Sequence, residues 1–96
     1  ATLPEGFGLD QNFPNPFNPS TAIRYSLAEM ADVKLSIYNM LGQQIRVLVR
    51  DARPAGVHTV EWDGRDAMGR HVATGLYFYR IEAGQFRATR KMTITK

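Results

Sequence analysis

The sequence predicts an all-β fold, an antiparallel β-sandwich of about seven strands that forms one domain over residues 1–96. Apolar residues recur at every second position, which is the period of a strand and not of a helix. The runs with this alternation follow one another at intervals of about 8 to 12 residues, with turn residues between them, as in sandwiches and barrels. No long helical pattern of the kind that a βαβ unit needs is present.

The first run, residues 7–13, alternates weakly, and residues 1–10 are expected to form a linker. Six clearer strands are expected at residues 23–27, 33–37, 45–49, 58–62, 77–81 and 86–94. Because a lone hairpin is not stable in water, these strands must pair into sheets whose apolar faces cover each other. We expect Trp62, Tyr25, Tyr77 and Tyr79 to supply the largest side chains of the core.

The segments between the runs contain residues that favour turns. Gly42 and Gly84 lie where hairpins would require a positive φ. Pro54 and Gly56 form another turn signal. The longest break, residues 63–75, contains the glycines Gly64, Gly69 and Gly75.

Composition excludes several classes of function. The chain has no cysteine, so disulfides, thiolate metal sites and a cysteine nucleophile are absent. Its net charge of +3 is small and its basic residues are scattered, whereas nucleic-acid binders group them on one patch. No apolar run reaches the roughly 18 residues of a membrane span. The segment that starts at Ala1 lacks the features of a secretory signal, and we expect it to continue from a longer protein.

No catalytic or metal-binding motif stands out. His58 lies on the same alternating face as Trp62, so we expect it to be packed or at an edge, and His71 should be solvated. Asp63 and Asp66 share one loop, but the ligand spacing of a calcium loop is missing, and a turn is favoured. We therefore expect no enzyme activity, no cofactor and no metal.

Outward-facing rings could stack on sugars. Alternation leaves Tyr38 and Phe78 facing solvent or a second interface, without a clear platform of neighbouring rings. A carbohydrate-binding module therefore remains an alternative, as does a structural spacer or assembly domain.

Residues 11–20, "QNFPNPFNPS", hold three prolines and three asparagines. Proline fixes φ near −65° and pushes the preceding residue toward extended conformations. The segment should therefore be a stiff, non-helical strap that leads into the first main strand, with Phe13 and Phe17 pinning it to the sandwich. Two roles stay open for it: sealing an edge of the core, or being read by a receptor as a preformed element.

Several motifs, taken in order, resemble the C-terminal sorting domain of the type IX secretion system. These are the asparagine-proline strap with Asn15, Pro16 and Phe17, then "WDG" at residues 62–64, and the closing Lys91-Met92. The full set of markers adds Asn12, Pro14, Asn18, Pro19, Tyr38, Gly42, Gly75 and Tyr77. The resemblance runs from Leu9 to Lys96. Residues 60–81, "VEWDGRDAMGRHVATGLYFYRI", are also similar to the Ig-like domain of the flagellar hook-capping protein, which implies an Ig-like form of the sandwich.

The sorting-domain resemblance implies a non-catalytic address label on a larger exported protein, with the cargo before Ala1. Its partners would be the outer-membrane secretion machinery and a sorting peptidase, and the chain would act as a monomer. The exported protein would pass through the periplasm and end at the cell surface or outside the cell. A glycoside hydrolase is one type of cargo found in the family, and an accessory module of such an enzyme is the alternative function.

The resemblance also implies roles for particular residues. Candidates for sorting and recognition are Arg90, Lys91, Met92, Lys96, Asn15, Pro16 and Phe17. Candidates for a structural role are Trp62, Asp63, Gly64, Gly75 and Tyr77. Since an edge strand presents unpaired N–H and C=O groups, we expect the last strand, Thr89–Lys96, to offer its backbone edge to the machinery.

Overall fold

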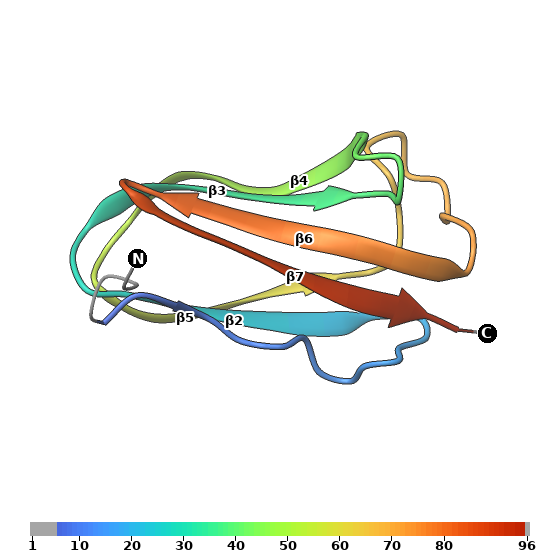
Figure 1. Cartoon of the computed structure of the whole chain (residues 1–96), viewed down its shortest axis with the longest axis horizontal. Coiled ribbons are helices and arrows are strands. Elements are labelled where there is room, and N and C mark those ends of the chain that lie inside the picture. The colour runs from blue at the N-terminus through green and yellow to red at the C-terminus, as the bar shows by residue number, and fades with distance from the viewer. Residues whose placement is uncertain (1–5, 96) are drawn as a thin grey trace.

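The computed structural model describes residues 6–95 as seven strands in two antiparallel sheets (Figure 1). The three-stranded sheet has the order β1-β2-β5, with β1 at Gly8–Leu9, β2 at Thr21–Leu27 and β5 at Gly56–Trp62. The four-stranded sheet has the order β4-β3-β6-β7, with β3 at Ala31–Tyr38, β4 at Gln44–Arg53, β6 at Gly75–Ala83 and β7 at Phe86–Ile94. The two sheets lie face to face, which confirms the predicted β-sandwich.

All six clear runs of alternation lie in strands, whereas the weak run at residues 7–13 is a strand only at Gly8–Leu9. Beyond β1, the chain still follows β2, because Phe13 and Ala22 exchange two backbone hydrogen bonds of 2.9 Å. Between these points Asn12 directs its backbone N–H to the hydroxyl of Tyr79 instead of to β2. The pairing is interrupted because one residue turns into the core.

The core fills the space between the sheets. Trp62, Tyr25, Tyr77 and Tyr79 are all buried, as predicted. Phe17 is buried as well, with 1% of its surface exposed, and its ring centroid lies 5.6 Å from that of Trp62. Phe13 was predicted to pin the strap too, but this prediction is wrong, since Phe13 is 79% exposed.

Four segments that contribute to the candidate functional site lie at one end of the sandwich. The β3–β4 turn, the loop at residues 63–74, the start of β2 and the end of β7 lie together there (Figure 1). A backbone hydrogen bond of 3.0 Å from Ala67 to Ile45 joins the loop to β4. Over residues 6–95 the structure contains no helix that is long and apolar enough to cross a membrane.

Candidate functional site

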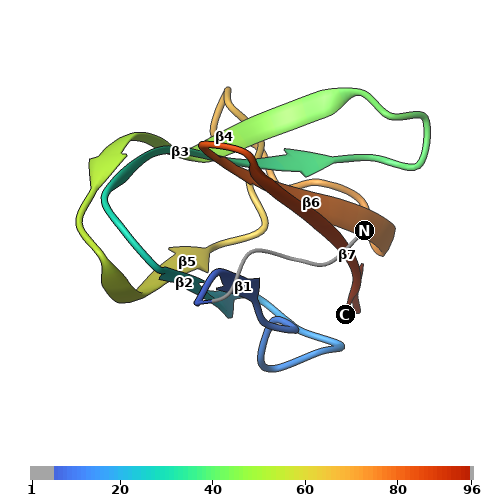
Figure 2. The same ribbon diagram turned by 60° about the vertical axis from the view of Figure 1, so that its left-hand side comes forward.

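The strap, residues 11–20, binds along the edge of β7. Phe17 donates its backbone N–H to the carbonyl of Thr93 and accepts the N–H of Thr95, both at 3.0 Å. Asn15 Oδ1 accepts the N–H of Thr93 at 3.0 Å. Phe17 thus pairs in parallel with Ile94, and Figure 2 shows the strap, in blue, beside the end of β7. The first and last segments of the domain are therefore joined directly.

A buried hydrogen-bond network fixes the start of the strap to the middle of the four-stranded sheet. The Tyr79 hydroxyl accepts the N–H of Asn12 at 2.8 Å and donates to the carbonyl of Asp10 at 2.6 Å. The Asn12 side chain, which is 2% exposed, donates to Thr21 Oγ1 at 3.0 Å and to the carbonyl of Pro14 at 3.2 Å. Burial raises the pKa of Tyr79 to about 12, so the hydroxyl stays protonated and can donate.

The candidate sorting residues divide into two groups. Phe17 and Met92 are buried, with 1% and 0% of their surfaces exposed, so they act through packing. Asn15, Pro16, Arg90 and Lys91 are exposed and can meet a partner directly. Arg90 also donates from Nε to the carbonyl of Leu9, which links β7 to β1. Lys96 lies outside the described residues.

The backbone edge of β7 is only partly free. In an antiparallel ladder, alternate residues direct their N–H and C=O groups away from the neighbouring strand. On β7 the residues whose backbone groups point away from β6 are Arg87, Thr89, Lys91 and Thr93. The strap binds both the N–H and the C=O of Thr93. The Lys91 carbonyl accepts from Gln11 Nε2 at 2.8 Å. By the same alternation, the groups of this edge that no residue of 6–95 occupies are the N–H of Lys91 and both groups of Thr89 and Arg87, so within the described residues the expectation of an open last strand holds for its first half only.

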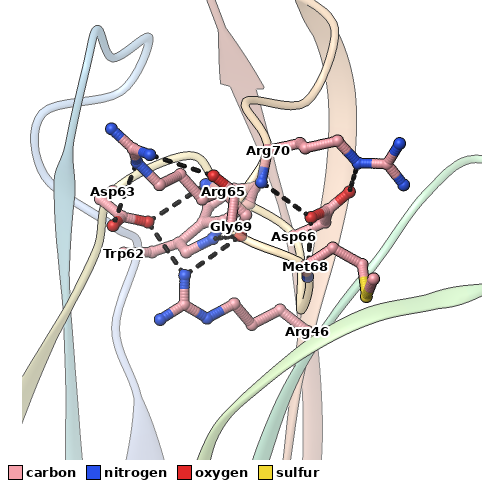
Figure 3. Close-up of polar contacts among 8 residues, drawn as sticks. All are labelled: Arg46, Trp62, Asp63, Arg65, Asp66, Met68, Gly69 and Arg70. Atoms are coloured by element: carbon pink, nitrogen blue, oxygen red, sulfur yellow. Dashed lines mark hydrogen bonds and ion pairs between the residues drawn. The ribbon is translucent and has the colours of Figure 1, made fainter.

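Trp62 organises the loop that follows it (Figure 3). Its Nε1–H donates to the carbonyl of Arg65 at 2.9 Å. Arg46 Nη1 reaches the same carbonyl at 3.2 Å and Asp63 Oδ1 at 3.0 Å. Asp63 also accepts the N–H of Arg65 at 3.1 Å. Trp62 and Asp63 thus hold the backbone of this loop, with Arg46 as a partner that strand alternation does not reveal.

The second carboxylate of the loop closes a turn. Asp66 Oδ1 accepts the N–H groups of Met68 at 2.9 Å and of Arg70 at 3.0 Å (Figure 3). The backbone hydrogen bond from Arg70 is the main cause that lowers the pKa of Asp66 below its usual value. This carboxylate is therefore used by the backbone, in agreement with the predicted turn.

Two glycines and one tyrosine shape the same end. Gly64 has a φ of 77°, and a Cβ placed there would lie 3.2 Å from the carbonyl oxygen of Pro19 in the strap. Gly75 begins β6 with a φ of 139°. The Tyr77 hydroxyl donates to the carbonyl of Ala73 at 2.7 Å, in the manner of the tyrosine corner of Ig-like sandwiches.

The histidines take packing and surface positions. His58 stacks on Tyr25 with ring centroids 5.3 Å apart and lies 2.8 Å from the carbonyl of Pro54 through Nε2. His71 is exposed. Within the described range, no three His, Asp or Glu side chains gather closely enough to hold a metal ion.

A row of side chains crosses the outer face of the four-stranded sheet. Tyr38 on β3 lies opposite Phe78 on β6, and Phe78 lies opposite Lys91 on β7. Both rings are half-buried. Two hollows of about 280 and 370 Å³ share Phe78 and Thr89 in their walls and are called here the Phe78 groove. Arg80 also lines it, through the register of β6, and so does Gln11, through its hydrogen bond to the Lys91 carbonyl.

A protein-family model matches this chain over most of its length. The family model of the FlgD Ig-like domain matches residues 18–85. The chain belongs to this family. No curated protein matches the sequence of this FlgD-type Ig-like domain. The match confirms the similarity to the flagellar hook-capping protein, and it leaves most of the strap and all of β7 outside the family range.

Solved structures share the fold. Latent PorU of Porphyromonas gingivalis has a TM-score of 0.74 and 20% identity, and the alignment covers 93% of this FlgD-type domain and 9% of PorU. PorZ, an essential surface component of the type IX secretion system of the same organism, has a TM-score of 0.60 and 17% identity, with coverage of 96% and 12%. FlgD of Pseudomonas aeruginosa has a TM-score of 0.61 and 19% identity, with coverage of 77% and 58%. The chain thus spans a small part of PorU and PorZ and just over half of FlgD.

Proposed function

We propose that this domain is a non-catalytic C-terminal sorting and cell-surface attachment domain of a larger exported protein. The outer-membrane type IX secretion machinery and a sorting peptidase recognise it, and the upstream cargo carries the activity of the whole protein. The domain passes through the periplasm as a folded monomer and reaches the cell surface or the medium.

The observation that carries this proposal is the joining of the strap to β7. These are the two segments that lie largely outside the FlgD-type match, and they are also the ones that hold the asparagine-proline and Lys91-Met92 motifs of the sorting resemblance. Phe17 binds the backbone of Thr93 and Thr95 across about 80 residues of sequence, so the two motifs form one structural unit. The fold shared with PorU and PorZ is consistent with this proposal.

The residues of this unit have distinct proposed roles. Phe17 and Met92 are buried and hold the end of the domain in shape. Asn15 caps the edge of β7 through Thr93. The exposed Arg90 and Lys91, together with Lys96 and Pro16, are proposed to contact the machinery.

An export assay tests the proposal. A reporter protein fused before residue 1 should reach the cell surface in a bacterium with a type IX system and stay inside an isogenic strain that lacks the machinery. Deleting residues 92–96 should abolish display. Because this deletion also removes the buried Met92 and Ile94, the Lys96→Ala variant serves as the second test, since it leaves both of these side chains in place. Display that persists without the machinery, or that is unchanged in both variants, would overturn the proposal.

A further inference from the structure

The Phe78 groove combines an apolar floor with positive charge. Its floor is formed by Tyr38, Phe78 and Met40, and Met40 is 68% exposed. Methionine is flexible and polarizable, and it is frequent on surfaces that bind apolar side chains. Tyr38 and Phe78 are held side by side by the register of β3 and β6. The floor is therefore a preformed site for an apolar side chain.

Two cations border this floor on the outer face, namely Arg80 and Lys91. Arg90 lies opposite the buried Tyr79, on the inner side of β7, where its Nε donates to the carbonyl of Leu9. No carboxylate of residues 6–95 lines either hollow of the groove. Glu82, which lies beyond the groove, approaches Arg80 at 3.5 Å, so Lys91 carries most of the uncompensated charge. Such a surface attracts a partner of the opposite sign.

A neighbouring hollow on the same outer face provides a contrast. Its volume is about 460 Å³, and its charged lining residues are Lys34, Arg50, Arg87, Asp32, Asp51 and Glu82. Three cations are matched there by three carboxylates. Positive charge is thus concentrated at the Phe78 groove rather than spread over the sheet.

The half of the β7 edge that is unpaired among residues 6–95 lies beside the groove. Thr89 lines both hollows, and its N–H and C=O point away from β6, as do those of Arg87 and the N–H of Lys91. An extended peptide can pair with such an edge through its main chain while its side chains enter nearby pockets. The strap ends this free stretch, because Gln11 and Phe17 occupy the rest of the edge.

We propose that the Phe78 groove binds an extended acidic polypeptide segment that carries an apolar side chain. The apolar side chain lies on Phe78 and Tyr38, the carboxylates face Lys91 and Arg80, and the main chain pairs with β7 at Thr89. The inference rests on the proposed function, since it assigns this segment to a protein of the secretion machinery. A peptide is favoured over an anionic saccharide because the free N–H and C=O groups repeat at the spacing of a strand.

The binding test uses the purified domain and a fluorescein-labelled decapeptide of alternating glutamate and valine. Fluorescence anisotropy should show binding that weakens with added salt, and a peptide with lysine in place of glutamate should not bind. Lys91→Glu should weaken binding roughly tenfold or more. Lys34→Glu is the matched control, because it makes the same charge change in the balanced hollow and should have a much smaller effect. Amide NMR shifts should localise the peptide to Phe78, Thr89 and Lys91.

Several outcomes would overturn the inference. They are no binding of the acidic peptide, equal weakening by the two charge reversals, or shifts confined to another face. Binding of an oligogalacturonate that competes with the peptide and is favoured over it would also overturn it, in favour of a saccharide site. The export assay keeps the two proposals apart. If the domain directs surface display and Lys91→Glu does not reduce it, the groove assignment fails while the sorting function stands; if the unaltered domain directs no display, the sorting function itself fails.

Discussion

The backbone N–H of Asn12 donates a hydrogen bond of 2.8 Å to the hydroxyl of Tyr79, 67 residues further along the chain. This hydroxyl also donates to Asp10, so one buried oxygen holds the entry of the strap against the four-stranded sheet. Asn12 thereby interrupts the pairing with β2, which resumes at Phe13 before the strap reaches β7 at Phe17.

Tyr79→Phe should therefore destabilise the domain. The substitution keeps the ring but leaves the N–H of Asn12 and the carbonyl of Asp10 without this partner, at a cost of about 1–3 kcal/mol. Urea unfolding followed by Trp62 fluorescence measures the loss. Tyr38→Phe is the control and should stay within about 0.5 kcal/mol, since Tyr38 is half-buried on the outer face. Equal effects of the two substitutions would contradict the role of the Tyr79 hydroxyl.

Stability should fall at alkaline pH because of the same residue. Burial raises the pKa of Tyr79 from 10.0 to about 12, so the folded state keeps a proton that the unfolded chain releases earlier. The resulting contribution is complete below pH 10 and is lost as the pH rises toward 12. Burial also raises the pKa values of Tyr25 and Tyr77, so Tyr79→Phe should reduce this pH dependence without removing it. Urea midpoints between about pH 9 and 11.5 provide the measurement, and identical slopes in the two proteins would refute the assignment.

Phe17→Ala should remove the main apolar contact of the strap. Phe17 packs on Trp62, and deleting a fully buried aromatic ring costs about 3–5 kcal/mol through lost transfer energy and the cavity left behind. Phe13→Ala is a matched control in the same strap, since Phe13 is exposed and should contribute less than about 0.5 kcal/mol. Thermal or urea unfolding compares the two, and a small effect of Phe17→Ala would show that the strap does not depend on this contact.

Gly64→Ala should be more harmful than the same change at Gly42. Both glycines have a φ near 80°, which costs a residue with a side chain about 1–2 kcal/mol. At Gly64 the new Cβ would also lie 3.2 Å from the carbonyl oxygen of Pro19, whereas at Gly42 nothing lies within 4 Å. The difference between their unfolding free energies therefore measures the contact between the 63–74 loop and the strap. Equal losses of unfolding free energy would mean that the strap moves away from the new Cβ at residue 64 with no loss of stability.

Local patterns predicted most of the fold. The alternation of apolar residues located six strands, and the aromatic residues Trp62, Tyr25, Tyr77 and Tyr79 were correctly assigned to the core because inward and outward positions alternate strictly along a strand. The carboxylates of the 63–74 loop were correctly assigned to turns, since Asp66 accepts the N–H groups of residues only two and four positions away. Interactions of this range are contained in the sequence itself.

The site depended on contacts that no local pattern contains. Sequence reasoning left two roles open for the strap, and the structure shows it sealing the end of β7 through hydrogen bonds between residues 78 apart. Arg80 and Phe78 share a groove with Lys91 only because β6 pairs with β7 in a particular register. Strand alternation specifies which side of a strand a residue faces, but not which strand lies beside it.

The sequence by itself determined the strands, their buried faces and the non-helical path of the strap, because these follow from residue-by-residue preferences of the backbone and from the period of apolar side chains. Only the tertiary structure decided that the strap closes half of the β7 edge, and that the other half, unpaired within the part of the chain that the structure describes, lies beside a basic, apolar groove. The reason is that pairing and packing between distant segments arise when the whole core assembles, and many arrangements of the same strands satisfy the local pattern equally well.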